Sequence, residues 1–62
     1  MKLYRIKYPD RITYYETSMK YKIEKPCNGK YWELKEFRKN RYVTIIYFQY
    51  FKNAKQYLTD NI

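Results

Sequence analysis

Histidine is absent from this 62-residue chain, which also has only one cysteine, one glycine and two prolines. The lone Cys27 can form no internal disulfide, and without histidine the usual ligand set of a structural zinc site is missing. No run of about 18 apolar residues occurs, and the N-terminal segment lacks the apolar stretch of a signal peptide. We therefore expect no metal, no cofactor, no membrane partner and a cytoplasmic location.

Side chains suited to catalysis are equally scarce. Ser18 is the only serine and stands in no glycine-rich elbow, and Cys27 has no histidine partner to activate it. Glu33 and Glu36 differ in strand parity, so on one regular strand they point to opposite faces and cannot act as a carboxylate pair. We expect that the protein is not an enzyme.

Basic and aromatic residues, by contrast, are abundant. Fourteen Lys and Arg against six Asp and Glu give a net charge of +8, and 23% of the residues are aromatic. With 45% hydrophobic residues the chain is too apolar for a disordered tail, and its length closes one core only. These features predict one folded domain over residues 1–62 and an acidic partner.

Alternation of apolar and charged residues predicts β-strands in the first third of the chain. Residues 2–8 alternate in this way and stop at the turn signal Pro9-Asp10. Residues 11–18 fit either a strand or a helix, and their Thr and Tyr content favours a strand. We expect residues 1–18 to form an N-terminal hairpin or strand extension of a sheet.

Residues 19–50 are predicted to form an antiparallel meander. Its first two strands present apolar residues to one side, and these are Met19, Tyr21, Ile23, Trp32 and Leu34. Between these strands, Asn28-Gly29 is the pair best suited to the positive backbone dihedrals of a hairpin turn. The stretch 42–50 is apolar on both faces, as in a central strand or in one whose second face meets a partner.

The apolar period changes near the C-terminus, where one helical stripe contains Ala54, Tyr57, Leu58 and Ile62. Asn53 is a suitable N-cap, and Gln56 three residues later completes a capping-box pattern. A helix over residues 53–61 is too short to persist alone and must dock on the sheet. The predicted fold is α+β, a small antiparallel β-meander of three to five strands with one C-terminal helix packed on one face.

The sheet face away from the helix is expected to be basic and aromatic. Lys and Arg neutralise phosphates, a two-stranded ribbon fits a major groove, and rings stack on unpaired bases. The candidate contact residues for a nucleic acid or an acidic protein are Lys20, Lys22, Lys30, Tyr31, Lys35, Phe37, Arg38, Lys39 and Arg41. The alternative is that the lysines are solvated residues that protect the sheet from edge-to-edge aggregation.

The order of elements over residues 20–60 resembles a family of small domains. A Trp-containing strand, a basic turn and an apolar strand lead into FQYFKNAKQYL, in which Phe51, Ala54, Tyr57 and Leu58 match a closing "xxAxxYL" helix. The chain thus resembles the three-strand-plus-helix proteins of phages and mobile elements, best understood as the arm-binding N-terminal domains of phage-type tyrosine recombinases. The resemblance implies a phage protein that lays its sheet in the DNA major groove, in the host cytoplasm. This chain has no catalytic recombinase domain and adds residues 1–18, which implies a stand-alone factor.

Two functions remain open on these grounds. The first is DNA binding, or nucleic-acid binding more generally, as a small accessory protein. The second is a host-protein inhibitor or adaptor that uses the same face, or strand addition at a sheet edge, with Tyr31 or Phe37 as anchors. A homodimer whose basic face only keeps the protein soluble is a third arrangement.

Overall fold

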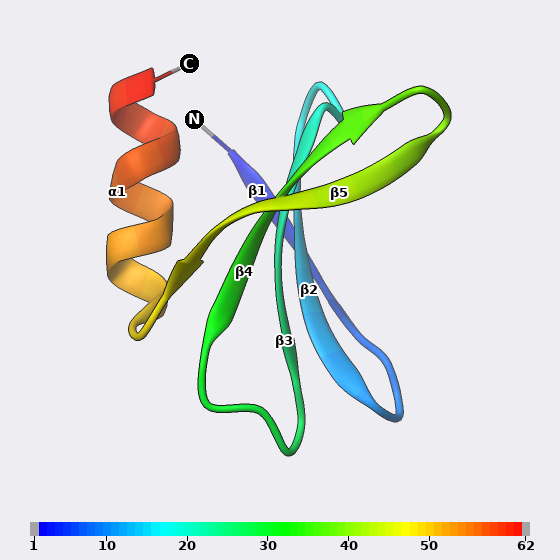
Figure 1. Cartoon of the computed structure of the whole chain (residues 1–62), viewed down its shortest axis with the longest axis vertical. Helices are drawn as coiled ribbons and strands as arrows, with labels where there is room; N and C mark the ends of the chain where they lie inside the picture. Colours follow the sequence, from blue (N-terminus) through cyan, green and yellow to red (C-terminus); the bar gives the residue numbers. More distant parts are fainter. Residues whose placement is uncertain (1, 62) are drawn as a thin grey trace.

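Strands form where apolar and polar residues alternate, and a helix forms where the apolar spacing changes to three and four residues. The computed structural model describes residues 2–61 (Figure 1). Its elements are β1 (Leu3–Lys7), β2 (Arg11–Glu16), β3 (Tyr21–Pro26), β4 (Trp32–Arg38), β5 (Arg41–Phe48) and α1 (Phe51–Asn61). The strands form one antiparallel sheet in the order β1-β2-β3-β4-β5. The predicted α+β meander with a C-terminal helix is confirmed, and β2 shows that the ambiguous 11–18 stretch supplies a strand.

The hydrophobic core lies between α1 and one face of the sheet (Figure 1). The strand register aligns Tyr14 with Ile23 and Ile23 with Leu34. The fully buried side chains of the core, each at most 1% exposed, are Ile23, Leu34, Ala54 and Leu58. Burying each Ile or Leu stabilises the fold by about 1.5–3 kcal/mol. Packing on β3, β4 and β5 therefore holds a helix of 11 residues that would be marginal alone.

The residues predicted to face the helix do so, with one exception. Tyr21 and Trp32 pack against the buried core, as predicted. Met19 lies instead in the turn between β2 and β3, with a φ of 66°, and borders a hollow on the opposite side of the sheet. The left-handed backbone at Met19 breaks the alternation, so β3 begins at Tyr21.

The predicted start of the helix is wrong by two residues. The carbonyl of Tyr50 accepts the backbone N–H groups of Asn53 at 3.2 Å and Ala54 at 3.4 Å, so Asn53 lies inside the first turn. Phe51 opens α1 because its ring packs against Tyr14, with centroids 4.3 Å apart. Hydrophobic packing has therefore overridden the capping-box pattern. Ile62, the last residue of the predicted stripe, lies outside the described residues.

The Asn-Gly turn also differs from its prediction. Neither Asn28 nor Gly29 has a positive φ. The N–H of Gly29 donates to the Pro26 carbonyl at 2.9 Å, and a Cβ on Gly29 would lie 3.0 Å from Pro26 Cδ, a tight contact that the proline ring would have to relieve by a small shift. The turn with two left-handed residues joins β4 to β5, at Lys39 (φ 49°) and Asn40 (φ 67°), in the manner of a type I′ hairpin.

β1 and β5 are the two edges of the sheet. The prediction of a central strand at 42–50 is therefore wrong, because the strands pair in chain order and β5 is the last in that order. One side of β5 packs on the core through Ile46 and Phe48. On β5, Ile45 and Tyr47 remain 37% and 66% exposed. The alternative, that the second face of this strand meets a partner, remains a prediction.

Candidate nucleic-acid interface

The open face, defined as the side of the sheet opposite α1, carries a row of charged residues across its middle. The register places Lys22 beside Lys35, and Glu24 between Thr13 and Glu33. The sequence predicted that Lys22, Lys35 and Phe37 share this face. Their surroundings decide what each of them can contact.

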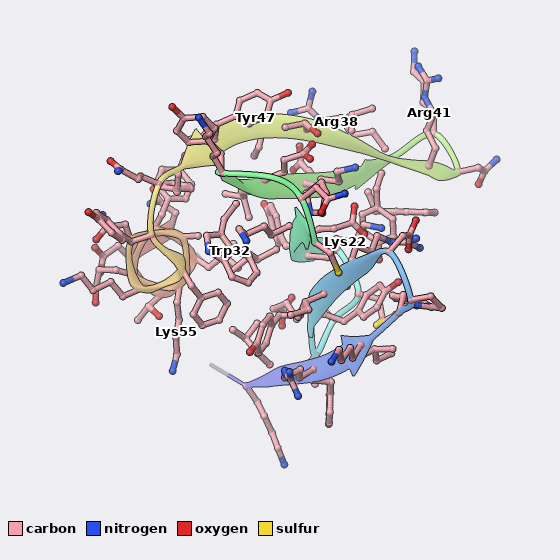
Figure 2. All side chains as sticks on the ribbon, turned by 90° about the horizontal axis from the view of Figure 1, so that it is seen from below. Lys22, Trp32, Arg38, Arg41, Tyr47 and Lys55 are labelled. Carbon is pink, nitrogen blue, oxygen red and sulfur yellow. The ribbon has the colours of Figure 1, made fainter. Side chains whose placement is uncertain are left out.

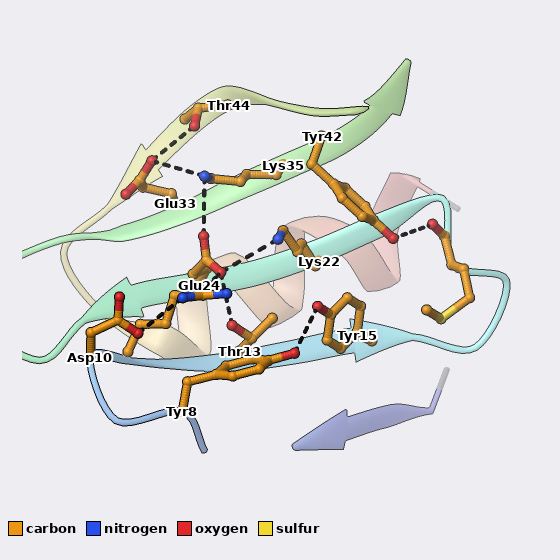
Figure 3. Close-up of polar contacts among 12 residues, drawn as sticks. Tyr8, Asp10, Thr13, Tyr15, Lys22, Glu24, Glu33, Lys35, Tyr42 and Thr44 are labelled. Atoms are coloured by element: carbon orange, nitrogen blue, oxygen red, sulfur yellow. Dashed lines mark hydrogen bonds and ion pairs between the residues drawn. The ribbon is translucent and has the colours of Figure 1, made fainter. Parts of the chain in front are cut away.

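Glu24 is the centre of a hydrogen-bonded ion network (Figure 3). Its Oε2 accepts from Arg11 Nε at 2.8 Å, from Thr13 Oγ1 at 2.9 Å and from Lys22 Nζ at 3.4 Å. Its Oε1 lies 3.1 Å from Lys35 Nζ. Burial alone would raise the pKa of Glu24, but hydrogen bonds from Thr13 and Lys35 and the charges of both lysines lower this pKa to about 2.

Further ion pairs lie on both sides of Glu24, and the charges of the whole network sum to zero. Lys35 lies 3.8 Å from Glu33, whose carboxylate accepts from Thr44 at 2.8 Å, and Arg11 pairs with Asp10 at 2.9 Å. Three cations thus meet three carboxylates, namely Arg11, Lys22 and Lys35 with Asp10, Glu24 and Glu33. The lysine side chains are only 12% and 22% exposed. The charges of Lys22 and Lys35 are therefore neutralised within the network, and either lysine could contact a phosphate only if its ion pair with Glu24 were broken.

Four exposed cations lie at or beside the turn between β4 and β5. We call Lys20, Arg38, Lys39 and Arg41 the basic hairpin; all four are exposed. Lys20 belongs to it because its carbonyl accepts the N–H of Phe37 at 2.7 Å, at the base of the turn. Arg38 pairs with Glu36, while Lys39 and Arg41 have no salt-bridge partner within residues 2–61. The β4–β5 turn projects from the rest of the sheet, and Arg41 points away from it (Figures 1 and 2).

Two flanks of the basic hairpin differ in character. On one flank Arg38, Lys39 and Arg41 border a shallow pocket of about 400 Å³ together with side chains of β5. On the other, Phe37 stands edge-on to Tyr42 with centroids 5.1 Å apart. The charged groups and the exposed aromatic pair therefore lie on opposite faces of this ribbon.

Lys30 and Tyr31 are not part of this group. Both precede β4, whereas the β4–β5 turn lies at the other end of this strand, so the length of β4 separates them from Lys39 and Arg41. Lys30 and Tyr31 are exposed. The nine predicted residues thus divide into the neutral network, the basic hairpin with Phe37, and this distant pair.

The structure adds a hollow that the sequence did not predict. This tyrosine hollow, about 530 Å³ in volume, lies on the open face and is lined by Tyr4, Ile6, Tyr8, Tyr15, Met19 and Tyr42. The register brings Tyr4 directly opposite Tyr15. The alternation of Tyr4, Ile6 and Tyr8 was a usable signal for one wall. The other wall comes from residues far along the chain, and only the fold brings the two together.

Hydrogen bonds hold the rings of the hollow in place (Figure 3). The hydroxyl groups of Tyr8 and Tyr15 are 3.2 Å apart, and Tyr42 donates to the Met19 carbonyl at 2.6 Å. The hydrogen bond with Tyr15 raises the pKa of Tyr8, and burial raises that of Tyr42. Both hydroxyl groups therefore stay protonated at neutral pH.

Two other kinds of site are not found in the part of the chain that the structure describes. No group of three or more Cys, Asp or Glu side chains is placed to hold a metal ion within residues 2–61. The one helix in that range lacks the length and the apolar character needed to span a membrane.

Comparison with known proteins adds no relative. No family model matches the chain, and no curated protein or solved structure matches it either. The resemblance to recombinase arm-binding domains therefore stays a prediction.

Proposed function

We propose that the protein binds nucleic acid through the basic hairpin. The observation that supports this proposal is the separation of charge: the cations at the middle of the open face are neutralised, whereas Lys39 and Arg41 are exposed and unpaired within residues 2–61. Exposed Lys and Arg bind phosphates with release of counterions. The net charge of +8 attracts an anionic ligand to the protein, and the projecting ribbon offers it exposed cations.

The shape of the hairpin suits this role. Its two-residue turn has both central residues in the left-handed region, which fixes the directions of the flanking arginines. Arg38 and Arg41 form the closing pair of the turn. A ribbon of two strands is narrow enough to follow a phosphate backbone or enter a groove.

The salt dependence of binding tests the proposal. We expect replacement of Lys39 and Arg41 by Ala to flatten the slope of log affinity against log salt by about 1.4–1.8, from two lost phosphate contacts. The measurement is fluorescence anisotropy with a labelled oligonucleotide between about 50 and 200 mM salt.

The matched control removes the same charge from α1. Lys52 and Lys55 are exposed on the helix, and Lys55 lies far from Arg38 and Arg41 (Figure 2). The Lys52→Ala/Lys55→Ala variant should keep the original slope. Equal flattening in both double variants would mean that only net charge matters and would remove the hairpin from the proposal.

One observation favours a second candidate function, which is binding of a partner protein by strand addition. β5 is an edge strand, and its residues 42–48 carry no charged side chain. Edge strands of this kind offer unpaired backbone groups to another chain. An inhibitor or adaptor would use β5, with Ile45 and Tyr47 as exposed contacts.

A further inference from the structure

We infer that the tyrosine hollow receives an unpaired base, so that the ligand is single-stranded nucleic acid whose phosphates lie along the basic hairpin. This inference rests on the proposed function and names the substrate class for it. It gives a role to the aromatic residues of β1 and β2, which the hairpin alone leaves unused.

The hollow borders the basic hairpin at Lys20. Met19 lines the hollow and directly precedes Lys20 in the turn between β2 and β3. Tyr42 lines the hollow from the open face of the ribbon, whereas its neighbour Arg41 pairs with Arg38 and points to the opposite face. A strand whose phosphates contact Lys20 and then pass around the tip of the ribbon to Lys39 and Arg41 therefore crosses the mouth of the hollow.

The lining suits a flat aromatic ligand. Four tyrosine rings, one Ile and one Met surround the hollow, and Tyr4, Ile6 and Met19 at its rim are 49%, 43% and 51% exposed. The hydroxyl groups of Tyr8, Tyr15 and Tyr42 are held by hydrogen bonds within the protein. The inner rings are thus fixed before binding, and stacking on fixed rings loses little side-chain entropy.

The charges around the hollow distinguish a base from other apolar groups. Lys22 Nζ lies 4.5 Å from the centroid of Tyr42 and 5.6 Å from that of Tyr15, so the protein's own ammonium group takes the cation–π position. A cationic ligand such as a methylated lysine would meet Lys22 and a net charge of +8. An aromatic ring that belongs to a polyanion is attracted by the net charge of +8. Charge complementarity therefore selects a nucleobase.

Two exposed tyrosines provide a matched pair of variants. Tyr4 lies in the hollow and is 49% exposed, whereas Tyr31 lies outside it, before β4, and is 53% exposed. Neither substitution by Ala removes a buried side chain, so both variants should fold. The probe is a labelled oligo(dT) strand, and a duplex of the same length serves for comparison.

We expect Tyr4→Ala to weaken oligo(dT) binding by about 5- to 100-fold, which is the usual loss for one stacked base. Its salt slope should stay unchanged, because no phosphate contact is lost. Tyr31→Ala should bind like the original protein, and the duplex should bind more weakly than the single strand.

The failures of the two proposals can be told apart. Equal affinities of the Tyr4→Ala and Tyr31→Ala variants, or a duplex that binds as tightly as the single strand, would overturn the base-binding hollow while a hairpin-dependent salt slope still held. An unchanged slope for Lys39→Ala/Arg41→Ala would overturn the hairpin. No binding to either probe at low salt would overturn both.

Discussion

Glu24 is the residue on which the open face depends. It is 6% exposed and joins β3 to β2 and β4 through Thr13 and Lys35. Removing one member of such a buried ion pair leaves the other charges unpaired and costs about 3 kcal/mol or more. We predict that Glu24→Gln lowers the free energy of unfolding by this order, measured by urea titration of Trp32 fluorescence. Thr13→Val removes a single hydrogen bond and should cost about 1 kcal/mol.

The same residue sets the acid sensitivity of the fold. Because the pKa of Glu24 is lowered from 4.5 to about 2 in the folded protein, its contribution is present above pH 4.5 and is lost as the pH falls through 2. The difference in pKa corresponds to a contribution of about 3 kcal/mol. The Glu24→Gln variant should therefore lose less stability than the original protein between pH 5 and pH 2. Parallel curves for the two proteins would contradict the role of Glu24.

At the scale of the elements, two asparagines in two turns make a matched test. Asn40 has a φ of 67°, whereas Asn28 has no positive φ. Glycine adopts the left-handed region more readily than asparagine, so Asn40→Gly should stabilise the protein by about 0.5 kcal/mol and Asn40→Ala should destabilise it by about 1 kcal/mol. Asn28→Gly should be neutral or slightly destabilising, because it only adds freedom to the unfolded chain. Thermal unfolding of the three variants checks this order, and a stabilising Asn28→Gly would reverse the assignment of the turns.

Elements defined by local patterns could be predicted from the sequence, and features defined by distant contacts could not. Alternation correctly placed Trp32 and Leu34 against the helix, because period two is a property of the strand itself. The helix start was wrong because it depends on the packing of Phe51 against Tyr14. The hollow joins Tyr4 to Tyr42, which no local pattern relates.

Part of the candidate site could be predicted from strand parity, but the ion pairs of its lysines were not predicted. Lys22 and Glu24 have the same strand parity, so their pairing on one face was available from the sequence. The basic turn around Lys39 and Arg41 was predicted as a contact region, and its exposure supports keeping it. Lys30 and Tyr31 joined the prediction as the first residues of a strand expected over residues 30–37, whereas β4 begins at Trp32 and leaves both at the end far from the β4–β5 turn.

At the scale of the whole molecule, the two sheet edges are protected differently. β1 carries Arg5 and Lys7 within its five residues, whereas β5 has no charged residue after Arg41. A charged edge strand resists pairing with another chain, and an uncharged apolar edge invites it. The net charge of +8 keeps copies of the chain apart at low salt. The repulsion that protects β5 from pairing therefore comes from the whole molecule and not from charged residues on β5 itself.

This asymmetry predicts how the protein associates when its charge is screened. At about 1 M salt the Debye length falls to about 3 Å, so the original protein should associate through β5. Ile45→Lys places a charge on that edge and should slow the association several-fold, measured by light scattering and by thioflavin fluorescence. Ile6→Lys makes the same change on β1 and should leave the rate as it is, because that edge is already charged. Equal slowing by both variants would show that added charge alone is responsible. It would contradict the prediction that β5 is the edge that pairs with another strand.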